Sequence, residues 1–485
     1  MRIDPTDSSS VQIVRIHQRD YIGTGGTTAR VAGSSFAAPR LSVVARHTWV
    51  LRGNALNDFR FQYGKATFQG WPTPFKFTEV GNFSAERVQT IPTVIIRPSL
   101  TKGNQSSFLG PEPRWQFKND FSRVIGAHEL GFGVDLSWIH WQNDNLVGAA
   151  GTFTFATDAP FDATNPATYP FLFTQRLAPR NLIVRSTEHA AYVQDTWRMS
   201  DRVTTTLGLR YDVQHGVWLE NLFDQEQPEV RLGDRVLQAA GLLPRERFPF
   251  WQEGRGDNNN FGPRVGVAWD VRGNGREVVR GGFGVYYNRY RANASANELD
   301  LRASQVIIQN PSYPDPYGGR NPFHLASVAN IFRIQGNENR NPFTRQYSVG
   351  YGRQVGANLG LSVDFTMANG ANQHTTIDRN YFASPEDRAR GIRPMPQFGR
   401  ITEDRTDGRL RYRSLEIRAD RRMFGRWQFL ASYTLAFAKI DAEGLPADQF
   451  DRAADYGYAT ADRRHRGVLS GIVDVLVEIS RDASP

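Results

Sequence analysis

The amino-acid sequence predicts an all-β fold of antiparallel, up-and-down strands, and three observations support that prediction. Many segments alternate between large apolar residues and small or polar ones, these segments come in pairs joined by short turns, and long stretches without such a pattern separate the pairs. The chain has 485 residues and no cysteine, which excludes disulfides and thiolate metal sites. It also contains no run of about 18 apolar residues, so no membrane-spanning helix is predicted.

The alternation is clearest in the stretch RWQFLASYTLAFAK, residues 426–439. Large side chains recur at every second position, apart from a small alanine, and no charge interrupts the stretch between its two ends. A period of two is the pattern of a strand with two unlike faces. The bulky face of this strand carries Trp427, Phe429, Tyr433, Leu435 and Phe437.

The alternating segments form hairpins. Short turns rich in Gly, Asn and Asp, such as VRGNG at 271–275 and VGAN at 355–358, join the two halves of each pair. The predicted hairpins cover residues 43–63, 114–141, 188–214, 262–288, 344–367 and 411–438. The connections between hairpins are long, and the stretches at 216–260 and 289–342 are predicted to be irregular.

Short and long connections alternate along the chain. Because successive connections of an up-and-down sheet lie at opposite ends, one end of the sheet has only short turns and the other carries the large loops. Transmembrane β-barrels have this form. We therefore predict a partial barrel of about 12–14 strands with long extracellular loops, whose bulky face touches lipid. A soluble propeller or sandwich is the alternative, but propeller blades repeat every 40–45 residues or so, whereas these hairpins recur about every 70. We place the barrel region at 41–476, after a poorly defined segment or barrel start at 1–40 and before a truncated tail at 477–485.

Charged residues on the opposite face are the candidates for the wall of a water-filled lumen. There they would face a plug or a permeating solute, or be hydrated by channel water. The alternation assigns to this face Arg210, Asp212, Arg280, Asp364, Glu416, Arg418 and Asp420.

Several segments resemble a known family. The segment AAYVQDTWRMSDRVTTTLGLRYD resembles a barrel hairpin of TonB-dependent receptors. The segments NNNFGPRVGVAWDVRGNGREVVRGGFGVYYNR, NPFTRQYSVGYGRQVGANLGLSVDFTMANG, RYRSLEIRADRRMFGRWQFLASYTLAFAK and DRRHRGVLSGI are similar to its Oar-like branch. The match keeps the family's order over most of residues 114–475, while the first hundred residues match loosely, through NALNDFRFQYGK.

This resemblance implies an outer-membrane location in a Gram-negative-type bacterium. It also implies an N-terminal plug and a TonB-type energy-transducing protein as partners of the full-length family, beside the lipid itself. No plug and no closing C-terminal strand are recognisable, and plugged transporters have about 22 strands, so we expect a fragment. The implied function is energised uptake of a bulky solute such as an oligosaccharide, a peptide or a chelate. A passive pore, or a structural or adhesive surface barrel, is the alternative.

The sequence predicts no enzyme, no cofactor and no metal site, because its nine histidines are scattered without the spacing of a metal-binding motif. The net charge of +9 comes from arginines spread along the whole chain, which does not indicate a nucleic-acid surface.

Two features of the predicted loops each allow two interpretations. The tripeptide Arg255-Gly256-Asp257 is either an adhesion motif or ordinary turn material. Aromatic residues of the predicted loops either stack on a ligand or pack the loops together; they are Trp218, Phe248, Phe250, Trp251, Tyr313 and Tyr317.

Overall fold

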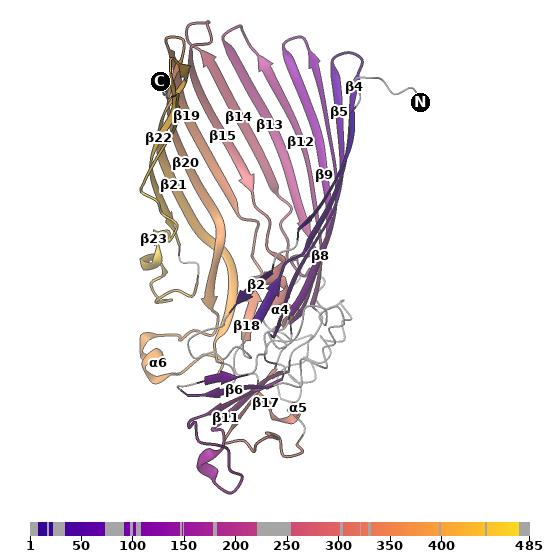
Figure 1. Ribbon diagram of the computed structural model, residues 1–485, viewed down its shortest axis with the longest axis vertical. Helices are drawn as coiled ribbons and strands as arrows, with labels where there is room; N and C mark the ends of the chain where they lie inside the picture. Colours follow the sequence, from indigo (N-terminus) through magenta and orange to yellow (C-terminus); the bar gives the residue numbers. More distant parts are fainter. Residues whose placement is uncertain are drawn as a thin grey trace, which may run out of the picture.

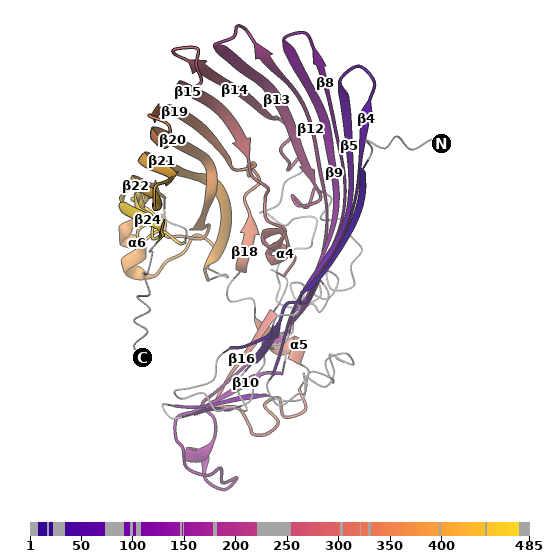
Figure 2. The same ribbon diagram turned by 45° about the horizontal axis from the view of Figure 1, so that its top comes forward.

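The protein is an open, curved antiparallel sheet with loop structure gathered at one end (Figures 1 and 2). The computed structural model describes residues 8–16, 19–22, 34–72, 92–97, 100–102, 108–145, 148, 150–177, 182–220, 254–300, 304–320, 322–327, 331–396, 399–441 and 444–474. No helix in these ranges is long and apolar enough to cross a membrane.

Within the described residues the main sheet has 18 strands, of which β2, β3, β18 and β23 are short additions at its margins. The other strands pair in chain order, each antiparallel to the next, so the prediction of about 12–14 up-and-down strands is confirmed. In order they are β1 (Ser8–Ile16), β4 (Arg40–Leu51), β5 (Ala55–Pro72), β8 (Phe108–Ile125), β9 (His128–Asn145), β12 (Leu182–Arg198), β13 (Val203–His215), β14 (Asn260–Asp270), β15 (Glu277–Tyr287), β19 (Phe343–Val355), β20 (Leu359–Asp378), β21 (Ile401–Phe424), β22 (Trp427–Ile440) and β24 (His465–Val473).

All the predicted hairpins are present, and their tight turns lie together at the upper end of Figure 1. Several turns contain residues in the left-handed backbone conformation, such as Asn54 at φ 55° and Gly126 at φ 58°. Gly and Asn adopt this conformation most readily, which is why they mark the turns in the sequence.

Many strands run further toward the loop end than the alternation predicts. The prediction for 344–367 stops short, because β20 continues to Asp378 and pairs with the part of β21 that starts at Ile401. Residues 368–378 read ANGANQHTTID and no longer alternate. Outside the apolar band, neither face of the sheet touches lipid, so large apolar side chains are not needed at alternate positions. The backbone hydrogen bonds between β20 and β21 therefore continue past the end of the alternating pattern.

The long connections are partly ordered, so the prediction that 289–342 is irregular is wrong. This stretch holds α4 (Ala292–Asp300), β16 (Ser304–Gln309), α5 (Pro322–Leu325), β17 (Ala326–Ser327) and β18 (Ile331–Gln335). Of 216–260, residues 221–253 lie outside the described part of the chain. The remaining elements are β2 (Arg19–Ile22), β3 (Ser34–Ala37), β6 (Thr93–Ile96), β7 (Leu100–Lys102), β10 (Thr152–Phe155), η2 (Pro166–Thr168), β11 (Leu172–Leu177), α6 (Pro385–Arg390), η4 (Arg452–Asp455) and β23 (Gly457–Tyr458).

Three of the long connections between hairpins meet in a second sheet at the loop end, which has six strands in the part of the chain that the structure describes (Figure 1). Its order is β17-β16-β11-β10-β6-β7, with β10 parallel to β6 and the other neighbours antiparallel. Phe153, Phe155 and Phe173 form its buried core. These loops therefore have an apolar core of their own, which the alternation pattern does not reveal.

We call residues 288–300 and 331–342 the inner segment, because α4 and β18 lie inside the curve of the main sheet (Figure 2). Tyr290 and Gln214 exchange two hydrogen bonds, Tyr290 N to Gln214 Oε1 at 2.9 Å and Gln214 Nε2 to Tyr290 O at 3.1 Å. On the other side β18 pairs in parallel with the outer end of β21. The inner segment thus connects two distant parts of the sheet across its concave side.

Candidate functional site

The main sheet has one bulky face and one polar face. Tyr351, Val363, Ile417 and Tyr433 are cross-strand neighbours in one continuous row, and the side chains of all four are exposed. A contiguous exposed apolar face of this kind is rare on soluble proteins. The polar face is the concave one, because Gln214 shares it by alternation with the predicted lumen residues and binds Tyr290 of the inner segment.

The predicted lumen residues fall into two groups on the polar face. Arg210 and Asp212 form an ion pair along β13, with Nε 3.0 Å from both carboxylate oxygens. The others lie on β15, β20 and β21, where Asp364 is opposite Glu416 and binds Arg280. Arg418 and Asp420 pair along β21 at 3.1 Å. That this face meets water remains a prediction.

The predicted lipid-facing residues lie together on the other face of β22. A cation stands over the ring at each end of this row: Arg421 is 3.6 Å from the centroid of Trp427, and Arg464 is 4.2 Å from that of Phe437. Ten residues of strand rise about 33 Å, or about 25 Å when tilted, which matches the height of an apolar band. Within this row Leu435 lies between Leu415 of β21 and His465 of β24, and Phe429 lies between Arg421 and Gly471. Each of the two is two residues inside a ring that carries a cation, so both lie within the predicted band at a similar distance from its ends.

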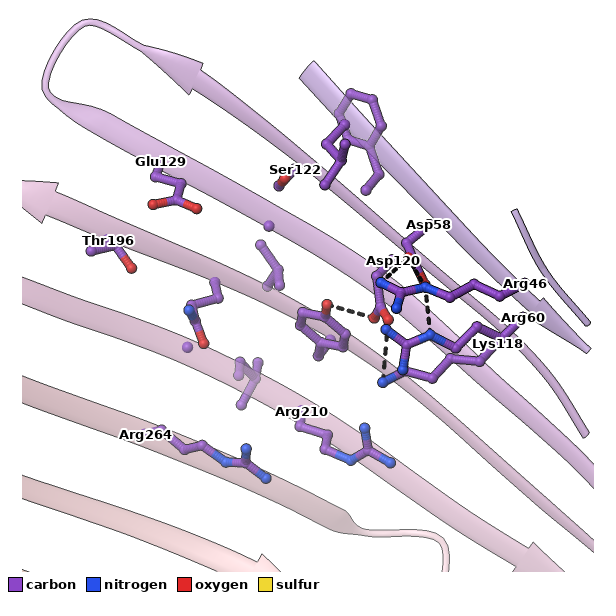
Figure 3. Close-up of a pocket in the computed structure, with 18 residues that line it drawn as sticks. Arg46, Asp58, Arg60, Lys118, Asp120, Ser122, Glu129, Thr196, Arg210 and Arg264 are labelled. Atoms are coloured by element: carbon purple, nitrogen blue, oxygen red, sulfur yellow. Dashed lines mark hydrogen bonds and ion pairs between the residues drawn. The ribbon is translucent and has the colours of Figure 1, made fainter. Parts of the chain in front are cut away.

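A hollow of about 510 Å³ opens on the polar face between β4 and β14 (Figure 3). Asp58 stands at its edge and is 5% exposed. It accepts hydrogen bonds from Arg46 Nε at 2.6 Å, Arg60 Nε at 2.6 Å and Thr48 Oγ1 at 2.9 Å. Two guanidinium groups thus compensate one nearly buried carboxylate, which the desolvation of a charge requires.

Glycines on the polar face let side chains reach across a strand. The Tyr192 hydroxyl on β12 donates to Asp120 Oδ1 on β8 at 2.8 Å, crossing β9 at Gly133. A Cβ atom at Gly133 would lie 2.2 Å from the Tyr192 ring. Likewise, Arg280 reaches Asp364 across Gly350, where a Cβ would lie 2.1 Å from Asp364 Oδ1.

We expect Gly133→Ala to destabilise the folded sheet by about 1–3 kcal/mol, because the added methyl group must displace the Tyr192 ring. The measurement is the urea unfolding midpoint of the chain folded into lipid vesicles. Gly131→Ala is the matched control on the same strand and face, since the nearest atoms to its Cβ lie 4.0 Å away. Equal losses of stability in the two variants would contradict this account.

A second hollow, of about 250 Å³, lies between the polar face and the inner segment. It shares Arg210 and Arg264 with the first hollow. Glu188 forms ion pairs there with Arg289 at 2.9 Å and with Arg114 at 3.5 Å. The two hollows therefore form one polar surface that continues from the sheet to the inner segment.

The inner segment is held by a buried ion pair. Arg255 and Glu298 are 2% and 1% exposed, and Arg255 Nη1 lies 2.6 Å from Glu298 Oε2. Arg255 Nη2 also donates to Glu298 Oε1 at 2.9 Å and to the carbonyl of Gln335 at 3.1 Å. Asp257 is buried as well and accepts from Asn341 N at 2.7 Å. The tripeptide at 255–257 is therefore part of the interior, and the adhesion hypothesis for it is not supported.

The described loop aromatics pack the loops together. Trp218 stacks on Tyr290 with ring centroids 4.5 Å apart, and burial raises the pKa of Tyr290 above its usual value. Tyr313 packs against Phe153, and Tyr317 packs against Phe173. Phe248, Phe250 and Trp251 lie outside the described residues.

Several residues of the hollows were not among the sequence candidates, although the same alternation could have found some of them. Asp135 and Ser137 alternate with the large residues of β9, and Asp58 and Arg60 occupy equivalent positions on β5. No pattern in the sequence indicates that Tyr192 lies over Gly133. Among the described residues no group of three or more His, Cys, Asp or Glu side chains is placed to hold a metal ion.

Comparisons with known proteins agree with this architecture. The family described as "Outer membrane beta barrel domain" matches residues 1–478. A search of curated proteins gives no match. Among solved structures, the outer-membrane transporter YddB of Escherichia coli is similar, with a TM-score of 0.58 and 10% identity over 90% of this chain and 46% of its own.

Two further structures have lower scores. The alcaligin outer-membrane receptor FauA of Bordetella pertussis has a TM-score of 0.49 and 12% identity over 99% of this chain and 56% of its own. The siderophore receptor PiuA of Acinetobacter baumannii has a TM-score of 0.48 and 9% identity over 91% of this chain and 53% of its own. The chain thus spans about half the length of these structures.

Proposed function

Because this chain belongs to the outer membrane β-barrel domain family, we propose that it is the barrel part of a transporter that takes up a bulky solute across the outer membrane. The family is one of outer-membrane barrels and not of enzymes, so the mechanism is gated permeation without covalent chemistry. The observation that carries the proposal is the continuous polar surface of the concave face, with hollows of about 510 and 250 Å³.

We further propose that the transporter is of the TonB-dependent-receptor type and of its Oar-like branch, with an N-terminal plug and a TonB-type energy-transducing protein as partners. The ordered segments between residues 114 and 475 support this, and so does the fold shared with a protein described as an outer-membrane transporter. The solute would dock on the outer loops and then pass along the polar face. The barrel boundaries at 41 and 476 remain part of this proposal.

Uptake experiments in the native host test the proposal. Deletion of the gene is expected to abolish uptake of one solute class among oligosaccharides, peptides and metal chelates, and a protonophore is expected to abolish the same uptake in the undeleted strain. Loss on deletion without protonophore sensitivity would instead indicate a passive pore. Unchanged uptake of every class would indicate a structural or adhesive barrel, for which the buried tripeptide at 255–257 gives no support.

A further inference from the structure

We propose that Arg264 anchors a binding site for an oxyanion, a carboxylate or phosphate group carried by a hydroxyl-bearing solute, on the polar face of the sheet. This inference rests on the proposed function, because it takes the concave face as the path of the solute. Arg264 lies on β14 at the junction of the two hollows and lines both of them.

The charges around the hollows single out Arg264. Every other described arginine or lysine that lines them has a carboxylate partner: Arg46 and Arg60 pair with Asp58, Lys118 with Asp120, Arg210 with Asp212, and Arg289 with Glu188. Arg264 has no carboxylate partner within the described part of the chain. A permanently charged guanidinium without a counter-charge in a polar hollow is suited to bind an anion.

The surroundings of Arg264 hold its side chain in place and leave space beside it. Its guanidinium carbon lies 4.7 Å from the centroid of the Tyr286 ring, a cation–π contact. Its cross-strand neighbours are Gly208, which adds no side chain to the wall, and Gly284, over which the Tyr286 ring lies. Its Nε is buried and has no hydrogen-bond partner among the described residues. Figure 3 shows Arg264 and Arg210 projecting from neighbouring strands.

A hydrogen-bond acceptor without a donor in the second hollow indicates that the ligand also carries a hydroxyl group. Asn260 is 1% exposed, lines the hollow, and has no partner for its Oδ1 among the described residues. It is four residues from Arg264 on the same strand and face, about 13 Å along the strand. A buried acceptor without a donor is costly, and a ligand hydroxyl would satisfy it. An extended ligand with an anionic group and hydroxyl groups, such as an acidic saccharide, fits both positions.

Calorimetric titration of the full chain folded in detergent tests this assignment, with three probes. Trigalacturonate carries carboxylates and hydroxyls, maltotriose has the same number of sugar units without charge, and inorganic phosphate is a free oxyanion. We expect trigalacturonate to bind more tightly than maltotriose. Phosphate binding that depends on Arg264 would also support the site and would show that a free oxyanion suffices. Equal binding of trigalacturonate and maltotriose, or no binding of any probe, would overturn the proposal.

The variants separate an anion site from a general charge effect. Arg264→Gln is expected to weaken trigalacturonate binding about tenfold or more, as for the loss of a charge-assisted hydrogen bond. Arg264→Lys should retain part of the affinity, since it keeps the charge and loses the planar fork. Arg280→Gln is the matched control, because Arg280 lies on the same face but already binds Asp364 through both carboxylate oxygens.

Circular dichroism and thermal unfolding establish that each variant is folded before titration. Wild-type affinity in the folded Arg264→Gln variant, or an equal loss in Arg280→Gln, would contradict the role of Arg264. Binding is measured without membranes or an energy source, so a negative result would overturn the anion site and would not affect the proposed transport function. Conversely, binding in the titration without energised uptake in the host would overturn the transport function and would still support the anion site.

Discussion

Replacing Glu298 by alanine is expected to destabilise the inner segment by about 3–5 kcal/mol, because the change leaves the buried guanidinium of Arg255 without its carboxylate. Hydrogen–deuterium exchange of the folded chain measures this locally. We expect amides of α4 and β18 to lose protection while those of β13 and β14 remain protected. The hydrogen bonds between Tyr290 and Gln214 should weaken with the segment they hold.

Two further variants make this result specific to the buried pair. Asp420→Ala removes the carboxylate of an exposed pair, whose partners are 49% and 51% exposed, and should cost at most about 1 kcal/mol. The double variant Arg255→Met with Glu298→Leu should recover much of the lost protection, since it removes both charges from the interior. Unchanged exchange in Glu298→Ala would show that other contacts hold the inner segment.

Leu435→Arg is expected to cost about 2–4 kcal/mol of folding free energy in a bilayer, because it places a charge on the lipid-facing side within the apolar band. Leu435 lies opposite Leu415 and between the two rings that carry cations. The measurement is the urea unfolding free energy of the chain in lipid vesicles.

Two substitutions on the same strand serve as comparisons. Phe429→Arg lies on the same face, two residues inside the other end of the row, and should cost a similar amount, about 2–4 kcal/mol. Ser432→Arg lies on the polar face opposite Arg418, and its effect should be small. Equal effects at all three positions would refute the assignment of the two faces.

The strands, their hairpins and their order could be predicted from the sequence because these features depend on neighbours in the chain. Period two shows which side of a strand each residue occupies, and Gly and Asn mark the turns. Both patterns can be read from a short stretch of sequence, as residues 426–439 show for the period of two. The division of the sheet into a bulky and a polar face followed from the same pattern.

The partners on the polar face were decided by the tertiary structure. Arg280 and Asp364 are 84 residues apart, and they meet because the register of β15, β19 and β20 places Gly350 between them. Tyr192 reaches Asp120 for the same reason. The alternation places each residue on a face but does not give the register between strands joined by long loops, so these pairs could not be predicted.

The inner segment shows the same division. Its residues carry no period that would predict where they lie, and the pairing of Arg255 with Glu298 depends on a chain path that folds back into the curve of the sheet. The sequence by itself thus determined the strands and their two faces, because these are local properties. Only the tertiary structure decided which charges are paired and that Arg264 has no carboxylate partner among the described residues, because such contacts join residues far apart in the chain.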